Sequence, residues 1–416
     1  MGKTIIEKII QAHSQDEVGP GNIVWLDLDI RSARDFGGPN VVQHYERQYG
    51  NTPLSDKSKT FFTFDLCAPA CTLKYADNQQ ICRDFARRHG IQVFDVDRGI
   101  GSHVLIEEGL AGPGQTVVGT DSHMNILGAV GCFGQGMGDV DIAFAFKTGK
   151  TWFEIPESVK VVLKGMPSPY SDPKDLTLFM CKELGTRSIA LRAAEFCGEA
   201  ATSLDFAGRI TLCSMITEMA GIVGFVSAEG PPSVLMPALL SGEMFSLYQA
   251  DPDALYADTI EINVEGLPPQ VAVPFSPNNV QTVAEVRGTR IDSGFIGSCT
   301  NGRTEDFVRA ADVLNGKKVK KGVMLKIVPA TRRVYQELLE RGILEILFQS
   351  GAIVLNPGCG GCADGHAGLT GQGEVQISSG NRNFSGKQGK GKTYLASPAV
   401  VAASCIRGEI VAPEEF

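Results

Sequence analysis

Apolar and polar positions in the first part of the chain follow two periods, one typical of helices and the other of strands. Apolar residues at helical spacing predict a helix over residues 4–13, and runs rich in branched and aromatic side chains predict strands over 23–30 and 61–65. Residues 78–89 have one apolar face and end at Gly90, which predicts a second helix. The N-terminal part therefore mixes helices with short strands.

The later parts of the chain differ from one another in pattern. After a predicted strand over 159–164, the pattern is helical over 175–185, 189–196 and 210–220. From residue 286 onward, strands and helices alternate, with predicted elements at 293–297, 305–313, 325–328, 331–341 and 352–355. Such alternation is typical of a parallel sheet with crossover helices, which binds ligands at the carboxyl ends of its strands.

The length of 416 residues predicts more than one hydrophobic core. Proline-containing stretches at 167–173 and 259–290 mark two boundaries between cores. We therefore expect an α/β protein of three domains, over residues 1–166, 167–285 and 286–416.

Composition and charge exclude several classes of protein. The net charge of −9 argues against a nucleic-acid-binding surface, and no apolar run reaches the roughly 20 residues that span a membrane. Glu7 interrupts the apolar N-terminus, which does not resemble a signal peptide. The 11 scattered cysteines are typical of reduced thiols rather than a disulfide framework, so we expect a cytoplasmic protein.

Three cysteines near the C-terminal end carry the strongest chemical signal. Cys299 follows a predicted strand, and Cys359 and Cys362 form a C-x-x-C pair surrounded by glycines. Such thiols can hold zinc, form a redox pair or bind an iron–sulfur cluster, and the glycines favour close approach of the backbone to a bulky inorganic group. A cubane cluster needs four ligands, so three thiolates would leave one iron open as a Lewis acid.

A carboxylate and two imidazoles form a second candidate group. Asp121, Ser122 and His123 follow the predicted strand that ends at Gly119, and His103 lies earlier in the chain. These residues have two interpretations on the sequence alone, a structural turn or an acid–base group. In the second interpretation, Asp121 would orient the ring of His103.

The motifs taken together resemble the aconitase family. The segment 298–303, the pair Cys359 and Cys362, and the segment 381–386 match the family's motifs in order, and the likeness extends to residues 394–398. Length and spacing are similar to those of its isopropylmalate dehydratase and homoaconitase large subunits. The resemblance implies three aconitase-like α/β domains around an iron–sulfur cleft, without the family's swivel domain.

The resemblance also implies roles for individual residues. A 4Fe–4S cluster, with one iron not ligated by protein, would be held by Cys299, Cys359 and Cys362. The residues implied in catalysis are Asp65, His103, Asp121, His123 and Glu195, the last as the acidic group near iron-bound solvent. The residues implied in substrate binding are Ser122, Asn301, Asn381, Arg382 and Lys387.

Two positions depart from the family pattern. Leu66 stands where the family has a histidine after Asp65. Either another group covers that step, with Asp65 acting alone or Cys67 nearby, or the substrate differs from the usual one. Lys387 stands where arginine is usual, which keeps the charge but loses the bidentate fork for a carboxylate. Both departures concern the substrate and its protons rather than the cluster ligands.

The resemblance implies a hydro-lyase that dehydrates and rehydrates a small hydroxy dicarboxylate together with a separate small subunit carrying the swivel domain. Isopropylmalate, on the path to leucine, is the first expected substrate. Homoaconitase and an alkylmalate dehydratase of the dimethylmalate type are alternatives. A non-catalytic iron–sulfur sensor and a zinc-binding structural protein are alternatives from other classes.

Overall fold

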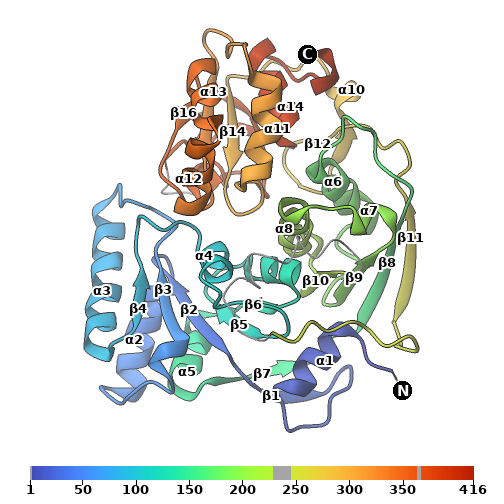
Figure 1. Ribbon diagram of the computed structural model, residues 1–416. Helices are drawn as coiled ribbons and strands as arrows, with labels where there is room; N and C mark the ends of the chain where they lie inside the picture. The colour runs from blue at the N-terminus through green and yellow to red at the C-terminus, as the bar shows by residue number, and fades with distance from the viewer. Residues whose placement is uncertain (1, 228–244, 363–366) are drawn as a thin grey trace.

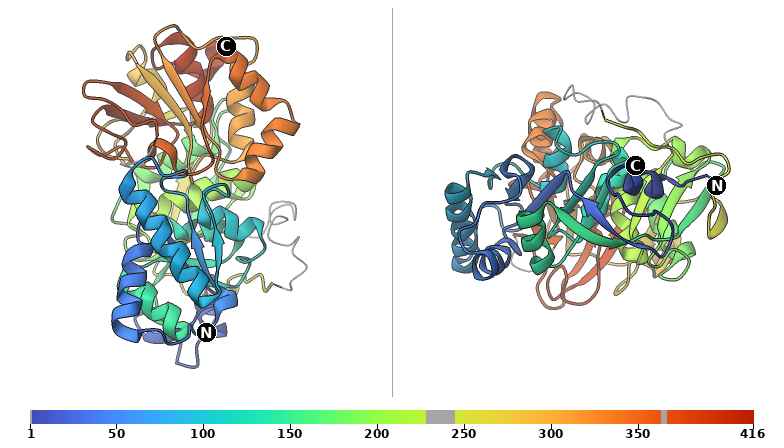
Figure 2. Two further views of the ribbon diagram at one scale, coloured as in Figure 1. Left: turned by 90° about the vertical axis from the view of Figure 1, so that its left-hand side faces the viewer. Right: turned by 90° about the horizontal axis from the view of Figure 1, so that it is seen from below.

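Three parallel or mostly parallel sheets organise the computed structural model, which describes residues 2–227, 245–362 and 367–416. Each sheet is covered by its own helices, and the third sheet with its helices lies above the other two (Figure 1). The same separation into an upper and a lower part is visible after a quarter turn (Figure 2). The predicted α/β class is therefore confirmed.

The first sheet has five parallel strands in the order β4-β3-β2-β5-β6. The strands are β2 (Ile30–Arg34), β3 (Thr60–Thr63), β4 (Gln92–Phe94), β5 (Thr116–Gly119) and β6 (Phe133–Gly136). The accompanying helices are α2 (Gly38–Tyr49), α3 (Leu73–His89), α4 (Gly101–Glu107), η2 (Met124–Val130) and α5 (Asp139–Thr148). Phe62 on β3 is fully buried against Phe85 and Phe146, which anchors helices α3 and α5 on the sheet.

The second sheet has four parallel strands in the order β10-β9-β8-β11. The strands are β8 (Ser158–Lys164), β9 (Ala193–Cys197), β10 (Val223–Val226) and β11 (Asp258–Asn263). The accompanying helices are α6 (Pro173–Leu184), α7 (Glu199–Thr202), α8 (Phe206–Met215) and η3 (Ile216–Met219). Helix α6 begins at a capping box in which Asp172 and Asp175 satisfy each other's backbone N–H groups.

The third sheet has seven strands in the order β13-β12-β18-β17-β14-β15-β16. The strands are β12 (Gln270–Ala272), β13 (Val280–Thr282), β14 (Ser293–Gly297), β15 (Met324–Val328), β16 (Ile353–Val354), β17 (Val375–Ser378) and β18 (Lys392–Ala396). The helices are α10 (Val283–Val286), α11 (Thr304–Leu314), α12 (Arg332–Glu340), α13 (Ile343–Ser350), η5 (Gly360–Cys362) and α14 (Pro398–Arg407). Strands β14 to β18 are parallel, as the alternation predicted, whereas β12 pairs antiparallel with both β13 and β18.

The remaining elements connect the sheets. Helix α1 (Ile5–Ala12) buries four isoleucines, and β1 (Ile23–Asp27) pairs antiparallel with β7 (Lys150–Glu154). Two further short helical turns are η1 (Lys57–Lys59) and η6 (Pro413–Glu415). No described helix has both the length and the apolar surface needed to cross a membrane.

One predicted element is wrong. Residues 189–196 have a helical pattern, yet β9 occupies Ala193–Cys197 in the second sheet. Four of its five side chains are buried, so both faces are covered and the strand has no alternation of polar and apolar residues. A short buried run of this kind is ambiguous between helix and strand.

The expected domain boundaries do not coincide with the division between sheets. Strand β8 ends before residue 166, yet it pairs with β9 and β11 of the second sheet. Strands β12 and β13 precede residue 285, yet they extend the third sheet through β18. The chain leaves the first sheet before the prolines at 167–173, and it enters the third sheet directly after Pro268 and Pro269.

Candidate active site

The three cysteines of the C-terminal motifs lie together at the edge of the third sheet. Cys299 follows β14, while Cys359 and Cys362 lie in the loop after β16, and all three are buried. Gly358 has a φ of +150°, and a Cβ atom there would lie 2.8 Å from the carbonyl oxygen of Asp65. Only glycine allows this loop to approach the first sheet so closely.

Asn381 connects two of these thiols. Its amide oxygen lies 3.2 Å from Sγ of Cys362, and its amide nitrogen lies 3.5 Å from Sγ of Cys299. Burial raises the pKa of Cys299 to about 12, and the neighbouring Cys362 adds to the rise. A nearby positive charge would favour the thiolate form of Cys299, as a bound metal does for its cysteine ligands.

The donor set at this place consists of three buried thiols. Among the described residues, no group of three or more His, Cys, Asp or Glu side chains is arranged to hold a single metal ion. Cysteine thiolates are the usual ligands of iron–sulfur clusters. No disulfide bond forms in the described part of the chain.

Asp65 and Asp121 approach the cysteines from the first sheet and share one cation. The guanidinium of Arg34, at the end of β2, donates to Asp65 at 2.7 Å and to Asp121 at 2.9 Å. The same group donates to Sγ of Cys359 at 2.7 Å. Burial raises the pKa of Asp65 to about 7 although Arg34 opposes the rise, whereas for Asp121 burial is outweighed by Arg34 and the pKa is lowered.

The turn after β5 brings Ser122 and His123 to residues from both other sheets. Nε2 of His123 lies 3.0 Å from the amide nitrogen of Asn381 and 3.0 Å from a carboxylate oxygen of Glu218. Glu218 accepts a bond of 2.6 Å from Arg382, which also donates to Ser122 at 3.3 Å. Burial lowers the pKa of His123, so this imidazole is neutral.

His103 lies on α4 beside the first cysteine, and its partner differs from the one expected. Its Nε2 donates to the carbonyl oxygen of Cys299 at 2.9 Å, while its buried Nδ1 has no bond among the described residues. Burial lowers the pKa of His103 to about 3, with the charge of Arg303 adding to the effect. The expected pairing with Asp121 is therefore wrong, because Asp121 binds Arg34 and the backbone of His123 instead.

The remaining predicted substrate residues occupy different surroundings. The amide nitrogen of Asn301 donates to Thr211 and Asp306, both at 3.0 Å, and its buried oxygen has no partner in the described chain. Lys387 lies half-buried on the turn after Asn381 and Arg382, and no bond joins its side chain to another described residue. The oxygen of Asn301 and the ammonium of Lys387 are thus available to a ligand.

Glu195 is the one predicted site residue that the structure places elsewhere. It lies on β9, and its carboxylate accepts bonds from the backbone of Ile5 at 2.7 Å and from Tyr256 at 2.6 Å. These contacts tie the N-terminal helix to the second sheet, on the side that carries α1. Glu218 is the carboxylate that contacts His123 and Arg382.

Two residues of this site were not predicted from the sequence, and each has a weak signal there. Arg34 ends a strand, which is where ligand sites occur in parallel sheets. Glu218 lies just after α8 within a mostly apolar segment, where a charged residue needs a partner. Neither signal names the partner, since the contacts are made across 31 and 164 residues of sequence.

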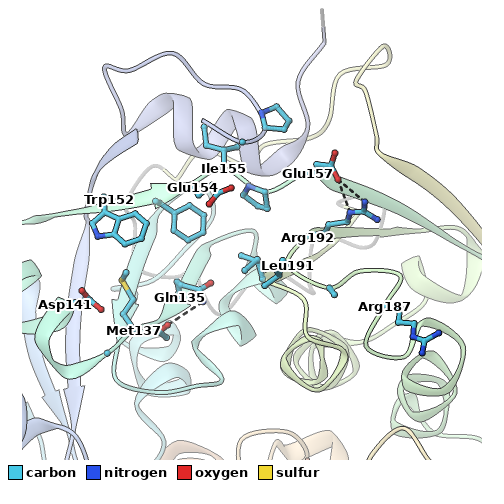
Figure 3. A pocket seen from close by; sticks show the side chains of 18 residues that line it. Gln135, Met137, Asp141, Trp152, Glu154, Ile155, Glu157, Arg187, Leu191 and Arg192 are labelled. Atoms are coloured by element: carbon cyan, nitrogen blue, oxygen red, sulfur yellow. Dashed lines mark hydrogen bonds and ion pairs between the residues drawn. The ribbon is translucent and has the colours of Figure 1, made fainter. Parts of the chain in front are cut away.

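A separate cavity of about 910 Å³ lies behind the Asp121 turn, between β7 and the segment before β9 (Figure 3). None of the predicted site residues lines it. Gly136 lines this cavity, and a Cβ atom there would lie 2.4 Å from the carbonyl oxygen of Asp121. Gly136 thus packs against the Asp121 turn at the edge of this cavity.

Comparisons with known proteins agree with this geometry. A model of the aconitase family (aconitate hydratase) matches residues 7–290 and 280–408. A probable 3-isopropylmalate dehydratase large subunit of Methanothermobacter thermautotrophicus is 40% identical, over 99% of each chain. A probable methanogen homoaconitase large subunit of the same organism is 39% identical, over 98% of this chain and 97% of its own.

Among solved structures, the holo form of aconitase X from Thermococcus kodakaraensis matches with a TM-score of 0.52 at 14% identity. The match covers 86% of this chain and 84% of that chain. At this identity the likeness concerns the fold alone.

Proposed function

The chain belongs to the aconitase family, and we propose that it is the large subunit of a 3-isopropylmalate dehydratase. It is a hydro-lyase of that family. The observation that carries the choice is similarity over the whole length to large subunits of that name. The proposed reaction interconverts 2- and 3-isopropylmalate by loss and return of water, on the path to leucine.

In this proposal Cys299, Cys359 and Cys362 hold a 4Fe–4S cluster. The burial of all three thiols and the contact of Cys299 and Cys362 with Asn381 support the assignment. When bound, such a cluster supplies an iron without a protein ligand, which acts as a Lewis acid on the substrate hydroxyl.

The chain's own residues would bind and orient the substrate. Arg382 lies beside Ser122 and pairs with Glu218, so its guanidinium is fixed in a plane suited to a carboxylate. Asn301 provides a buried oxygen without a partner among the described residues, and Lys387 provides a second cation on the segment that carries Arg382. We propose that Lys387 selects a carboxylate held by one point charge rather than by a fork.

The proton for the departing hydroxyl needs a donor, and Leu66 excludes the usual imidazole. Asp65, whose pKa is raised to about 7 by burial, is the carboxyl that holds a proton near neutral pH. His123 is neutral and touches Glu218, so this pair can accept or return a proton at Nε2. The base that removes the carbon-bound proton is proposed to come from a separate small subunit.

The experiment is to purify the chain with its small subunit, reconstitute iron and sulfide without oxygen, and follow absorbance of the unsaturated acid. We expect turnover of isopropylmalate, and its loss in Cys359→Ser. Turnover of a homocitrate-type tricarboxylate instead would favour the homoaconitase alternative, which the 39% identical relative supports. A chain that holds iron without any turnover would indicate the sensor alternative, and colourless zinc-loaded protein the structural one.

We also propose a cytoplasmic location. Eleven cysteines without a disulfide among the described residues are consistent with a reducing compartment.

A further inference from the structure

Arg34 belongs to the first sheet, and its side chain contacts the sulfur of a proposed cluster cysteine. It ends β2, and its side chain is only 12% exposed. Three different nitrogens are used: Nε donates to Asp65 at 2.7 Å, Nη1 to Asp121 at 2.9 Å, and Nη2 to Sγ of Cys359 at 2.7 Å. One planar group therefore fixes three partners that lie on three separate segments of the chain.

We propose that Arg34 is a positioning residue that tunes the cluster through Cys359 and holds Asp65 in place beside it. The inference rests on the proposed function, because it assigns Cys359 as a cluster ligand. Arginine keeps its proton at any working pH, so Arg34 supplies charge and direction rather than a proton.

The need for such a cation follows from its partners. Asp65, Asp121 and Cys359 are buried and all three accept from Arg34, so each would lose a buried donor without this cation. A guanidinium satisfies all three at once because its donors point in fixed directions, whereas a lysine ammonium is a single point charge.

The bond from Arg34 to sulfur has a consequence of its own. Hydrogen bonds to the sulfur ligands, together with local charge, set the reduction potential of an iron–sulfur cluster. A cation that donates to Cys359 withdraws charge from the thiolate, which makes the cluster easier to reduce. It also stabilises the ligated form of Cys359 against loss from the site.

The test compares Arg34→Lys and Arg34→Gln with wild type after oxygen-free reconstitution. Lysine keeps the charge but loses the fork, and glutamine keeps two N–H donors but loses the charge. The readouts are the midpoint potential from an electron paramagnetic resonance titration and the rate of iron loss to a chelator. We expect a more negative potential and a several-fold faster loss of iron in both variants, with the larger shift for glutamine.

Arg31→Lys is the matched control, since Arg31 is a buried arginine of the same strand that donates to the backbone of Leu28 and Asp56. It should leave the potential unchanged. Unaltered potential and iron loss in both Arg34 variants would overturn the inference while leaving the proposed function intact. Wild-type protein that takes up no iron would overturn the proposed function itself, and this inference with it.

Whether the variants fold is measured separately by the circular dichroism of the cluster-free chains. If either Arg34 variant unfolds, the other still decides, because each changes only one of the two properties. If both unfold while Arg31→Lys folds, the role of Arg34 is structural and the inference is wrong.

Discussion

A carboxylate oxygen of Glu218 lies 3.0 Å from Nε2 of His123, and both side chains are only 7% exposed. The contact joins the end of α8 in the second sheet to the turn after β5 in the first. We expect Glu218→Gln to lower kcat by about 100- to 10,000-fold, the usual contribution of a positioned acid–base group. Steady-state kinetics of the reconstituted two-subunit enzyme would measure the loss.

Glu195→Gln is the matched control for that change. Glu195 is also a buried glutamate of the second-sheet domain, but it binds Tyr256 and the backbone of Ile5. We expect its kcat to remain within a few-fold of wild type, with a modest loss of stability from the weakened contact to α1. Equal losses of activity in the two variants would contradict the assignment of Glu218.

Site residues that belong to a short local motif can be predicted from the sequence, whereas site residues defined by distant contacts cannot. The pair Cys359 and Cys362 is proposed from a local pattern, C-x-x-C among glycines, whereas Cys299 joins it through the order of motifs that resembles the aconitase family. Arg34 and Glu218 are missed, because their function depends on contacts between sheets that no spacing reveals. Glu195 is proposed from the same resemblance, and in the structure Glu218 makes the contacts to His123 and Arg382 instead.

The fold shows the same limit. The alternation after residue 286 predicts the parallel strands of the third sheet, since each element there has its own period. Strand β9 is buried on both faces and therefore carries no period that distinguishes it from a helix. Strand β8 belongs to the second sheet because it pairs with β9. Such pairing depends on distant strands rather than on local composition.

The burial of His103 leads to a second prediction, which concerns how the folding stability of the chain depends on acid pH. Burial lowers its pKa to about 3 from the usual 6.5, so the unfolded chain binds this proton first as the pH falls. Folding stability is then lost below pH 6.5, at about 1.4 kcal/mol per pH unit for this group. Urea unfolding of the cluster-free chain between pH 5 and about 8 should give a flatter acid limb for His103→Gln than for wild type.

The comparison has a built-in control, because the two chains should show the same pH dependence above pH 7, where this imidazole is neutral in both states. Parallel acid limbs would mean that His103 is not held neutral by its surroundings.

Substitution of Phe62 tests the core of the sheet that carries Arg34 and Asp65. It is fully buried, with ring centroids 6.0 Å from those of Phe85 and Phe146. We expect Phe62→Ala to lower the free energy of unfolding by about 3–5 kcal/mol, since removal of a buried aromatic ring leaves a cavity. The tryptophans Trp25 and Trp152 both lie in the adjoining β1–β7 pair, so their fluorescence should report unfolding of this part.

Leu73→Ala provides the reference for Phe62, because Leu73 is 85% exposed at the start of α3. Its effect should stay within about 0.5 kcal/mol. A similar small effect for Phe62→Ala would show that this ring is not part of a packed core.

Lys174 tests how the loop with Asn381 and Arg382 is held. It is fully buried on α6, and its ammonium donates to the carbonyl oxygens of Ser379 at 3.2 Å and Gly380 at 2.8 Å. We expect Lys174→Met to lower kcat/KM by about 100-fold, because a shift of the loop by about 1 Å misplaces the groups that follow it.

The stability of that variant should change little, since two effects oppose each other. Burial lowers the pKa of Lys174 to about 8, which marks a charge that is costly to keep inside. Methionine removes that cost, but two buried carbonyls lose their donor, at about 1–3 kcal/mol each. Wild type should also gain stability between pH 8 and 10.5, where the unfolded chain still holds this proton, and Lys174→Met should not.

Lys326→Met is the control for Lys174→Met. It measures the general effect of removing a buried lysine without changing the contacts of the loop with Asn381 and Arg382. Lys326 donates to Gly368 at 2.9 Å and to Gln376 at 2.7 Å within the third sheet, and none of these bonds involves a predicted site residue. Its removal should change stability by a similar amount while leaving kcat/KM within a few-fold. Equal losses of activity in both variants would mean that the third sheet as a whole, rather than the Lys174 contact, places Asn381 and Arg382.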